Sequence, residues 1–403
     1  MNTSALKKMI PLGLALGLCL QWIFLRQIDL NWSAPWQPVL PGLAVFGAAF
    51  LLSWAAELAQ MDIPQALALA FVALVAVLPE YAVDMYFAWI AGKDPSYIPY
   101  VTANMTGGNR LLIGVGWAAV VFAFWYKTGR KGISLEPGHR LEIFSLTAAT
   151  IYSFIIPFKK NMSLMDSFFL LIIFAAYMIA AARSHMVEPE LGEGPVESLS
   201  RLPALPRRIV TLFLFLLAGF SIIRAAGPFA EGLLATGKQL GVEEFLLVQW
   251  LAPLASESPE FIVAILFAVR GKPSAGIGTL VSSKVNQWTL LVGMLPIAYA
   301  LSSHATHPLT MDARQAEEVL LTSAQSLFAI ILLCDLEFSL WDGVVIFVLF
   351  VTQLFFTSTA QRLAYSGVYL VLAAGLLATR PSLRQGLATT CREGFRKINF
   401  FRQ

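Results

Sequence analysis

Charged residues are scarce in this chain of 403 residues, because only 13% are Asp, Glu, Lys or Arg whereas 57% are hydrophobic. A soluble domain carries roughly 25% charged residues. The shortage recurs in successive runs of about 20 apolar residues, the length that crosses a hydrocarbon layer of roughly 30 Å. The composition therefore excludes a soluble protein. It predicts a polytopic membrane protein, with the lipid bilayer as a partner.

Cysteine is equally sparse. The three cysteines, Cys19, Cys334 and Cys391, lie far apart without CxxC or Cys/His spacing, so the sequence predicts neither a disulfide framework nor a zinc site. It contains no HExxH motif, which disfavours an intramembrane metalloprotease. The net charge of +3 points to no particular partner. We expect no enzyme activity, no nucleic-acid partner and no tightly bound cofactor, and the oligomeric state is left open.

Twelve apolar stretches have the length of membrane spans, so the predicted fold is all-α. They lie near 9–26, 38–60, 64–92, 99–126, 142–158, 163–183, 209–236, 242–270, 275–301, 317–334, 341–358 and 363–379. The expected segments are an extra N-terminal span in 1–37, a first repeat in 38–183, a polar cytoplasmic linker in 184–208, a second repeat in 209–358, and an extra span with a basic cytoplasmic tail in 359–403.

Lysine and arginine mark the expected orientation. Most of these residues outside the spans fall in loops that face one side if both chain ends are cytoplasmic, as the excess of positive charge in cytoplasmic loops requires. Lys159 and Lys160 are exceptions to this bias. We therefore expect an integral protein of the plasma membrane (the inner membrane in a bacterium) with both termini inside.

Two stretches share an unusual pattern. Residues 250–293 contain Ser-Glu-Ser-Pro-Glu within an apolar run, which we expect to cut a helix, followed by a Gly/Ser-rich helix. Residues 74–116 repeat the order, with Pro79-Glu80 in place of Pro259-Glu260. Charges at membrane depth are costly and are usually functional. Duplicated, Pro-interrupted segments in two halves are the best sequence indication of a transporter's binding site.

Each of the two prolines can help to form a binding site, because proline removes a backbone donor and frees a carbonyl one turn earlier. We expect Pro79 to free the carbonyl of Val75, and Pro259 that of Ala255. Freed carbonyls beside a carboxylate form an oxygen-lined pocket that suits hard cations such as Ca²⁺ or Na⁺. Glycines at 107, 108, 276 and 278 allow the facing helices to approach closely.

This layout resembles the sodium/calcium exchanger (cation/calcium antiporter) superfamily, whose repeats carry G-T-S-x-P-E on one helix and G-N-x-x-G-S-N-x-x-[ND] on the next. The matching stretches here are VAVLPE (75–80) with ANMTGGNRLL (103–112), and ASESPE (255–260) with GTLVSSKVNQ (278–287). The resemblance covers about residues 38–360. It implies two inverted five-helix repeats that carry cations by alternating access, with one extra helix at each end.

The resemblance also implies the site residues. The central metal ligands are Glu80 and Glu260. Further ion-binding candidates are Ser256, Glu257, Gln287, Asn104 and Asn109. Counter-charge or gating candidates are Lys284, Arg110 and Asp84, and the helix-break positions are Pro79 and Pro259.

Departures from the family pattern concern the charge of the site. Glu80, Glu257 and Glu260 carry −3, which Arg110 and Lys284 reduce to −1 if both point inward. This balance argues against a site for several Na⁺ ions and one Ca²⁺. A buried lysine beside carboxylates is displaced, or loses its proton, when a cation arrives, so proton-coupled exchange is plausible.

Several alternatives stay open. Arg110 forms either a structural ion pair or part of a gate, Asp84 lies either beside the site or in a solvated vestibule, and the amides serve either ions or helix contacts. The predicted function is a secondary-active antiporter that moves Ca²⁺ or another cation against Na⁺ or H⁺. The main alternative is a non-transporting protein of the same fold, a sensor or assembly partner whose pocket Lys284 and Arg110 block. An anion substrate is disfavoured by the negative balance.

Overall fold

The computed structural model describes residues 3–25, 36–62, 77–183, 194–356 and 358–398, which are helical almost throughout. Nine of the helices in these ranges are long and apolar enough to cross a membrane. They are residues 7–25, 39–59, 95–128, 137–159, 164–183, 204–240, 244–269, 313–333 and 359–379. The expectation of an all-helical polytopic membrane protein is therefore confirmed.

The chain divides into two compact units, each built from two separate stretches. Unit 1 comprises residues 1–86 and 182–259, and unit 2 comprises residues 87–181 and 260–403. The divisions fall inside α4 (Leu78–Ala91) and α12 (Glu244–Val269), the two helices that carry the Pro-Glu pairs. Each unit therefore takes part of both expected repeats.

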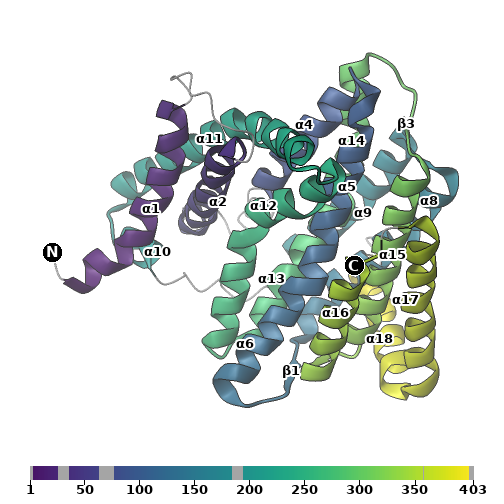
Figure 1. The fold of residues 1–403 in the computed structure, drawn as a ribbon. Helices are drawn as coiled ribbons and strands as arrows, with labels where there is room; N and C mark the ends of the chain where they lie inside the picture. The colour runs from purple at the N-terminus through teal and green to yellow at the C-terminus, as the bar shows by residue number, and fades with distance from the viewer. Residues whose placement is uncertain (1–2, 26–35, 63–76, 184–193, 357, 399–403) are drawn as a thin grey trace. The chain divides into compact units, whose positions relative to one another are not determined.

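Unit 1 is built around two long helices. It contains α1 (Thr3–Leu25), α2 (Val39–Ala59), α10 (Pro195–Ser200) and α11 (Ala204–Leu240). Helix α2 packs along α11, and α1 contacts both (Figure 1). Small residues permit this packing, since Gly42 of α2 faces the ring of Phe229. Just beyond α2, Asp62 forms ion pairs with Arg207 and Arg208 of α11, at 3.0 and 2.9 Å.

Unit 2 contains the two Gly-rich helices and the C-terminal part of the chain. Its elements after α4 are η2 (Pro95–Tyr97), α5 (Ile98–Leu111), η3 (Leu112–Trp117), α6 (Ala118–Thr128), η4 (Pro137–His139), α7 (Arg140–Ser153), α8 (Ile155–Lys159), α9 (Leu164–Arg183), α13 (Pro273–Asn286), η5 (Gln287–Leu291), α14 (Val292–Ser303), α15 (Ala313–Leu333), α16 (Leu340–Gln353), α17 (Thr359–Thr379) and α18 (Pro381–Ile398). Helix α15 is buried along most of its length and contacts α5, α7 and α17.

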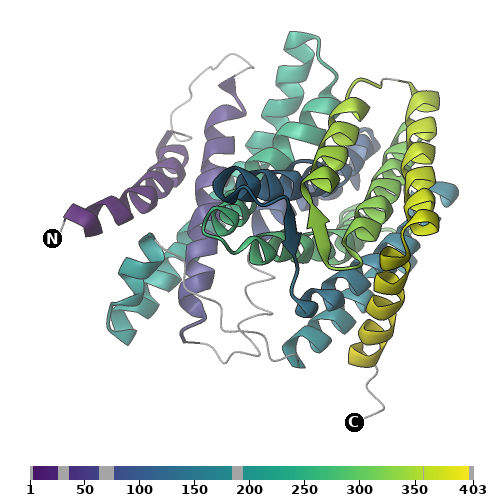
Figure 2. The same cartoon turned by 90° about the horizontal axis from the view of Figure 1, so that it is seen from below.

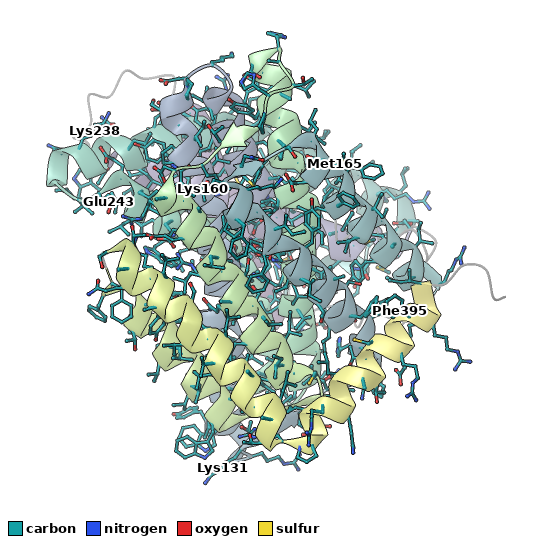
Figure 3. The ribbon with its side chains drawn as sticks, turned by 90° about the vertical axis from the view of Figure 1, so that its right-hand side faces the viewer. Lys131, Lys160, Met165, Lys238, Glu243 and Phe395 are labelled. Carbon is teal, nitrogen blue, oxygen red and sulfur yellow. The ribbon has the colours of Figure 1, made fainter. Side chains whose placement is uncertain are left out.

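Two short antiparallel ribbons join loops that are far apart in the sequence. β1 (Gly132–Ser134) pairs with β4 (Glu337–Ser339), and β2 (Asn161–Met162) pairs with β3 (Leu309–Thr310). Figure 2 shows the strands of the first ribbon side by side. Lys131 precedes β1 and Lys160 precedes β2, and Figure 3 places these two lysines toward opposite ends of the unit. The helical span 137–159 separates β1 from β2, and the span 313–333 separates β3 from β4.

The two Gly-rich helices share a further feature. In each, α-helix gives way to a short π-helix, at Leu112 after α5 and at Gln287 after α13. These are the residues that end the two matched motifs ANMTGGNRLL and GTLVSSKVNQ. π-helical turns are rare and occur mostly at functional sites. The duplication is therefore visible in the backbone as well as in the sequence.

The expectation that the Pro259 stretch cuts a helix was wrong, whereas the linker and the basic tail stay predictions. Helix α12 continues through Ser-Glu-Ser-Pro-Glu to Val269, so the run is not cut there. A proline can remain inside a membrane helix because neighbouring groups satisfy the backbone it frees. The expected linker 184–208 contains α10 and the start of α11, and the basic tail forms α18. The expected span 64–92 is described only from Val77 onward, because residues 63–76 lie outside the described ranges.

Helix α18 follows α17 in the chain, lies at an angle to it and packs on α7. Helices α17 and α18 are yellow in Figure 3, with Phe395 labelled on α18. Arg140, the first residue of α7, donates to the carbonyl of Gly386 at 3.3 Å and to the hydroxyl of Thr390 at 2.8 Å. Phe395 stacks edge-on against Phe144, with the ring centroids 4.9 Å apart. Helix α18 is thus a packed part of unit 2.

Candidate functional site

The two Gly-rich helices meet at a buried lysine. Lys284 of α13 has no exposed surface, and its Nζ donates to the main-chain carbonyl of Asn109 at 3.0 Å and to Oδ1 of the same residue at 2.8 Å. The ammonium also lies 4.6 Å from the ring centroid of Trp288. Asn109 and Lys284 occupy the same position of the two matched motifs. The structure thus brings together two of the predicted site residues.

The amides of α5 are buried along one helix. Asn109 donates from Nδ2 to the carbonyl of Met105 at 2.8 Å, which turns its Oδ1 toward Lys284. Asn104 lies in the same helix, and its buried Oδ1 accepts no hydrogen bond within the described part of the chain. Such an oxygen suits a hard cation, which prefers carbonyl and carboxylate ligands. Gln287 is buried at the start of η5.

Helix α4 carries the first Pro-Glu pair. It begins at Leu78, so Pro79 occupies its first turn, where a missing N–H costs little. Glu80 and Asp84 are both buried, each about 3% exposed, and they lie one turn apart on the same face. The position of Val75, whose carbonyl we expect Pro79 to free, is outside the described residues.

Helix α12 carries the second pair within a continuous helix. Because Pro259 has no N–H, the carbonyl of Ala255 lacks its usual donor. Ser256 donates back to the carbonyls of Ala252 and Pro253, both at 3.3 Å, and Ser258 donates to that of Leu254. Glu257 is almost completely buried. Glu260, the residue after the proline, is partly exposed.

Arg110 is engaged in an ion pair. Its Nη2 lies 2.6 Å from Oε2 of Glu318 in α15, and both side chains are buried. The ion pair that the sequence left open is therefore present, and a role for Arg110 in a gate stays a prediction. The charge of Arg110 is balanced by a carboxylate that is not among the predicted site residues.

The sequence interpretation did not include the acidic pair Glu317-Glu318, although it lies at the start of an expected span. Both glutamates are buried, and Arg362 donates to Glu317 at 2.8 Å. His139, which the sequence interpretation did not consider as a site residue either, is largely buried and lies against Gly278 of α13. The sequence did contain a signal for the Glu317-Glu318 pair, namely two adjacent carboxylates inside an apolar run.

The predicted ligands belong to both units. Glu80, Asp84, Ser256 and Glu257 are in unit 1, whereas Glu260, Asn104, Asn109, Lys284 and Gln287 are in unit 2. Among the described residues, no group of three or more His, Cys, Asp or Glu side chains is gathered so as to hold a metal ion. The meeting of Glu80 and Glu260 at one site stays a prediction.

An all-helical membrane protein with buried carboxylates beside helix prolines, and buried amides on duplicated helices, is of the secondary-transporter class. The family model described as "Sodium/calcium exchanger protein" matches residues 40–182 and 210–359. The chain therefore belongs to the sodium/calcium exchanger family, as its motifs predict. It is a membrane cation antiporter and not an enzyme.

Solved structures agree with this assignment. The structure described as the H⁺/Ca²⁺ exchanger CAX is 45% identical to this chain, with a TM-score of 0.92, and the match covers 97% of this chain and 98% of that one. Native YfkE is 14% identical with a TM-score of 0.63, covering 90% and 100%, and so shares the fold. The sodium-calcium exchanger NCX_Mj is 16% identical with a TM-score of 0.54, covering 80% and 97%. No curated protein gave a significant match.

Proposed function

We propose that this protein exchanges Ca²⁺ for H⁺ across the membrane by alternating access. The observation that carries the proposal is its 45% identity with an H⁺/Ca²⁺ exchanger over nearly the whole of both chains, at a TM-score of 0.92. The more distant similarity to a sodium-calcium exchanger supports the fold alone. Of the coupling ions that the sequence left open, H⁺ is therefore favoured over Na⁺.

The proposed ion site has Glu80 and Glu260 as its central ligands, with Glu257, Ser256 and Gln287 in support. Because Glu318 balances Arg110, the charge of the site comes from three carboxylates and Lys284 and amounts to −2. One Ca²⁺ neutralises that charge. A site with this balance suits a single divalent cation better than the −1 expected with both basic residues inside.

Lys284 offers a route for coupling to protons. Its ammonium donates to the two oxygens of Asn109 and lies against the ring of Trp288, in a fully buried position. A divalent cation that arrives nearby repels this charge, so that the lysine either moves away or releases its proton. Glu80 and Glu260 take up protons when the metal leaves, which completes the exchange.

The strand pairing supports two inverted repeats. A span separates β1 from β2 and another separates β3 from β4, so the members of each pair face opposite sides of the membrane. Since β1 pairs with β4 and β2 with β3, the first loop of one repeat lies on the same side as the second loop of the other. Equivalent helices of the two repeats then run in opposite directions, as inverted-repeat transporters require.

The finer architecture is part of the same proposal. It consists of about 12 spans, with the repeats in 38–183 and 209–358 and an extra helix before and after them. The protein lies in the plasma membrane (the inner membrane in a bacterium), with both termini in the cytoplasm. The helices of the structure overlap all the predicted spans within the described residues. The excess of lysine and arginine on one side supports the orientation.

A gradient exchange in proteoliposomes tests the function. With Ca²⁺ outside, we expect an acid interior to drive Ca²⁺ uptake and a Na⁺-loaded interior at equal pH to drive little. A result in which Na⁺ drives uptake and the pH gradient does not would refute the proposal. The membrane potential is clamped in both cases, so that charge movement does not contribute.

The alternative is a non-transporting protein of the same fold, and the burial of Lys284 between the Gly-rich helices is the observation that favours it. In that case neither gradient drives flux, although Ca²⁺ still raises the melting temperature if it binds. The ion pair of Arg110 with Glu318 weakens this alternative, because one of the two proposed blocking charges is occupied elsewhere.

A further inference from the structure

Arg110 takes part in a buried ionic network that joins three helices of unit 2. Its partner, Glu318 of α15, also lies 3.6 Å from Arg314 and 3.5 Å from Arg362 of α17. Arg362 in turn bonds Glu317 at 2.8 Å. The side chains of Arg110, Glu317, Glu318 and Arg362 are all at least nine-tenths buried. None of these carboxylates belongs to the proposed ion site.

The same helix holds Arg110 by its main chain. Gln325 of α15 donates from Nε2 to the carbonyl of Arg110 at 3.2 Å, and its Oε1 accepts from Gln353 of α16 at 3.4 Å. Arg110 is thus fixed at two points on α15, about two helical turns apart. It lies directly between Asn109, which accepts from Lys284, and the segment where α5 passes into the π-helix η3.

A buried guanidinium without a carboxylate partner is strongly unfavourable and remains charged. If Glu318 were neutral, one negative charge beside the Arg110 guanidinium would be lost, and the surroundings of Asn109, one residue away, would become more positive. At low effective dielectric, a positive charge repels a divalent cation over roughly 10 Å. The network therefore sets the charge beside Asn109, one of the predicted ion-binding residues.

We propose that Glu318 is a positioning residue for transport: it draws Arg110 onto α15, neutralises it, and so keeps Asn109 in place and the ion site negative. This inference rests on the proposed function, because it is measured through Ca²⁺ exchange. It assigns to Glu318 a role outside the Pro-Glu motifs and the Gly-rich helices.

The test is Ca²⁺ exchange by Glu318→Gln in proteoliposomes. We expect the KM for Ca²⁺ to rise on the order of a hundredfold, from repulsion by Arg110 across about 10 Å at an effective dielectric constant of about 20, and kcat to change much less. The matched control is Glu317→Gln, which removes the neighbouring carboxylate but leaves the Arg110–Glu318 pair. Its KM should stay within about twofold of that of the wild type.

A second substitution separates charge from general damage. Adding Arg110→Met to Glu318→Gln removes the arginine cation, so the double variant should recover most of the wild-type KM. A merely structural role predicts no recovery, because the double variant has lost the whole ion pair. If Glu318→Gln does not fold, Glu318→Asp keeps the charge with a shorter reach, and an intermediate KM is expected.

The inference is overturned if folded Glu318→Gln has the wild-type KM, if Glu317→Gln raises KM equally, or if Arg110→Met gives no recovery. For the Asp variant, an unchanged KM is the overturning result. Wild-type protein that fails to exchange Ca²⁺ would instead refute the proposed function and this inference with it. The two failures are therefore distinguishable in one set of assays.

Discussion

Lys284 is one of the residues that couple Ca²⁺ to protons in the proposed mechanism, together with Glu80 and Glu260. Replacing this lysine with Met keeps most of the buried volume and removes the ammonium, so the carboxylates of the site are no longer opposed. We expect Lys284→Met to bind Ca²⁺ more tightly, on the order of tenfold, because a nearby positive charge is gone. The measurement is Ca²⁺ affinity by calorimetry in detergent at several pH values.

The same variant should also show weaker pH dependence of exchange and fewer protons moved per Ca²⁺. Lys272→Met, at the exposed loop before α13, serves as a control that removes a lysine outside the buried contacts. Unchanged pH dependence and stoichiometry in Lys284→Met would eliminate the lysine from the coupling mechanism.

Asp62 illustrates a charge pair at the end of a span. A hydrogen bond from the Arg207 guanidinium, with further support from Arg208, holds the pKa of Asp62 below its ordinary value. A carboxyl whose pKa is lower in the folded state adds stability above its unfolded pKa of about 3.9, and this stability is lost as pH falls through the folded value.

We therefore expect Asp62→Asn to lower the stability of the folded protein at pH 7 by about 1 kcal/mol. The difference from the wild type should shrink as pH falls from the unfolded pKa of about 3.9 toward the lower folded value, because the unfolded chain takes up the proton first. Thermal unfolding in detergent at pH 7, 5 and 3.5 measures this. A difference that stays constant over this range would mean that the ion pairs are not its origin.

For individual residues, the sequence identified the buried basic side chains but not the groups that they contact. Lys284 and Arg110 were recognised as charges in apolar helices, yet Glu318 lies far along the chain from Arg110 and no local pattern links them. The burial of His139 likewise has no local signal, because its position outside the apolar runs does not show what packs against it. Pairing and burial depend on tertiary packing, which a single sequence does not contain.

Among the elements, the close approach of α12 and α13 depends on Gly276. A Cβ added to this glycine would lie 2.5 Å from the main-chain oxygen of Ala264, so one backbone would have to move. We expect Gly276→Ala to destabilise the protein by about 1–3 kcal/mol, the usual range for overpacking. Gly219→Ala is the control, because the added Cβ meets nothing within 4 Å.

Melting temperatures in detergent compare the two variants. Gly276→Ala should melt several degrees lower, while Gly219→Ala should melt at or above the wild-type temperature, since alanine favours helix. Equal melting temperatures for both variants would show that α12 and α13 are not in tight contact in the protein.

Helix positions were largely predictable because apolar runs of span length are strong signals, and the duplicated Gly-rich helices are α5 and α13. Two features were not. Pro259 was taken as the end of a helix, although α12 accommodates it, and the tail after Thr379 was taken only as a basic segment, although it forms α18. Both depend on neighbouring groups that hold a helix against its local sequence preference.

For the whole molecule, inverted repeats predict that the loops before β1 and β3 face opposite sides of the membrane. Arg130 and Thr306 are exposed residues of these loops. A membrane-impermeant maleimide added to right-side-out vesicles should label Thr306→Cys and not Arg130→Cys, with the reverse in inverted vesicles. Labelling of both from one side would contradict the inverted arrangement.

The duplication was predictable from two Pro-Glu pairs in matching surroundings, and the family match agrees with it. The division into compact units was not predictable in this way, because each unit takes part of each repeat and the boundaries fall inside α4 and α12. Sequence repeats reflect duplication, whereas compact units reflect packing, and the two need not coincide.

Proton release upon Ca²⁺ binding tests the central claim most directly. Purified protein in weakly buffered detergent solution is mixed with Ca²⁺, and a pH dye reports the protons released. We predict that the wild type releases protons, that Glu80→Gln and Glu260→Gln each release fewer and bind Ca²⁺ weakly, and that Na⁺ alone has little effect. Ca²⁺ binding without proton release, or full release from both glutamine variants, would contradict the account.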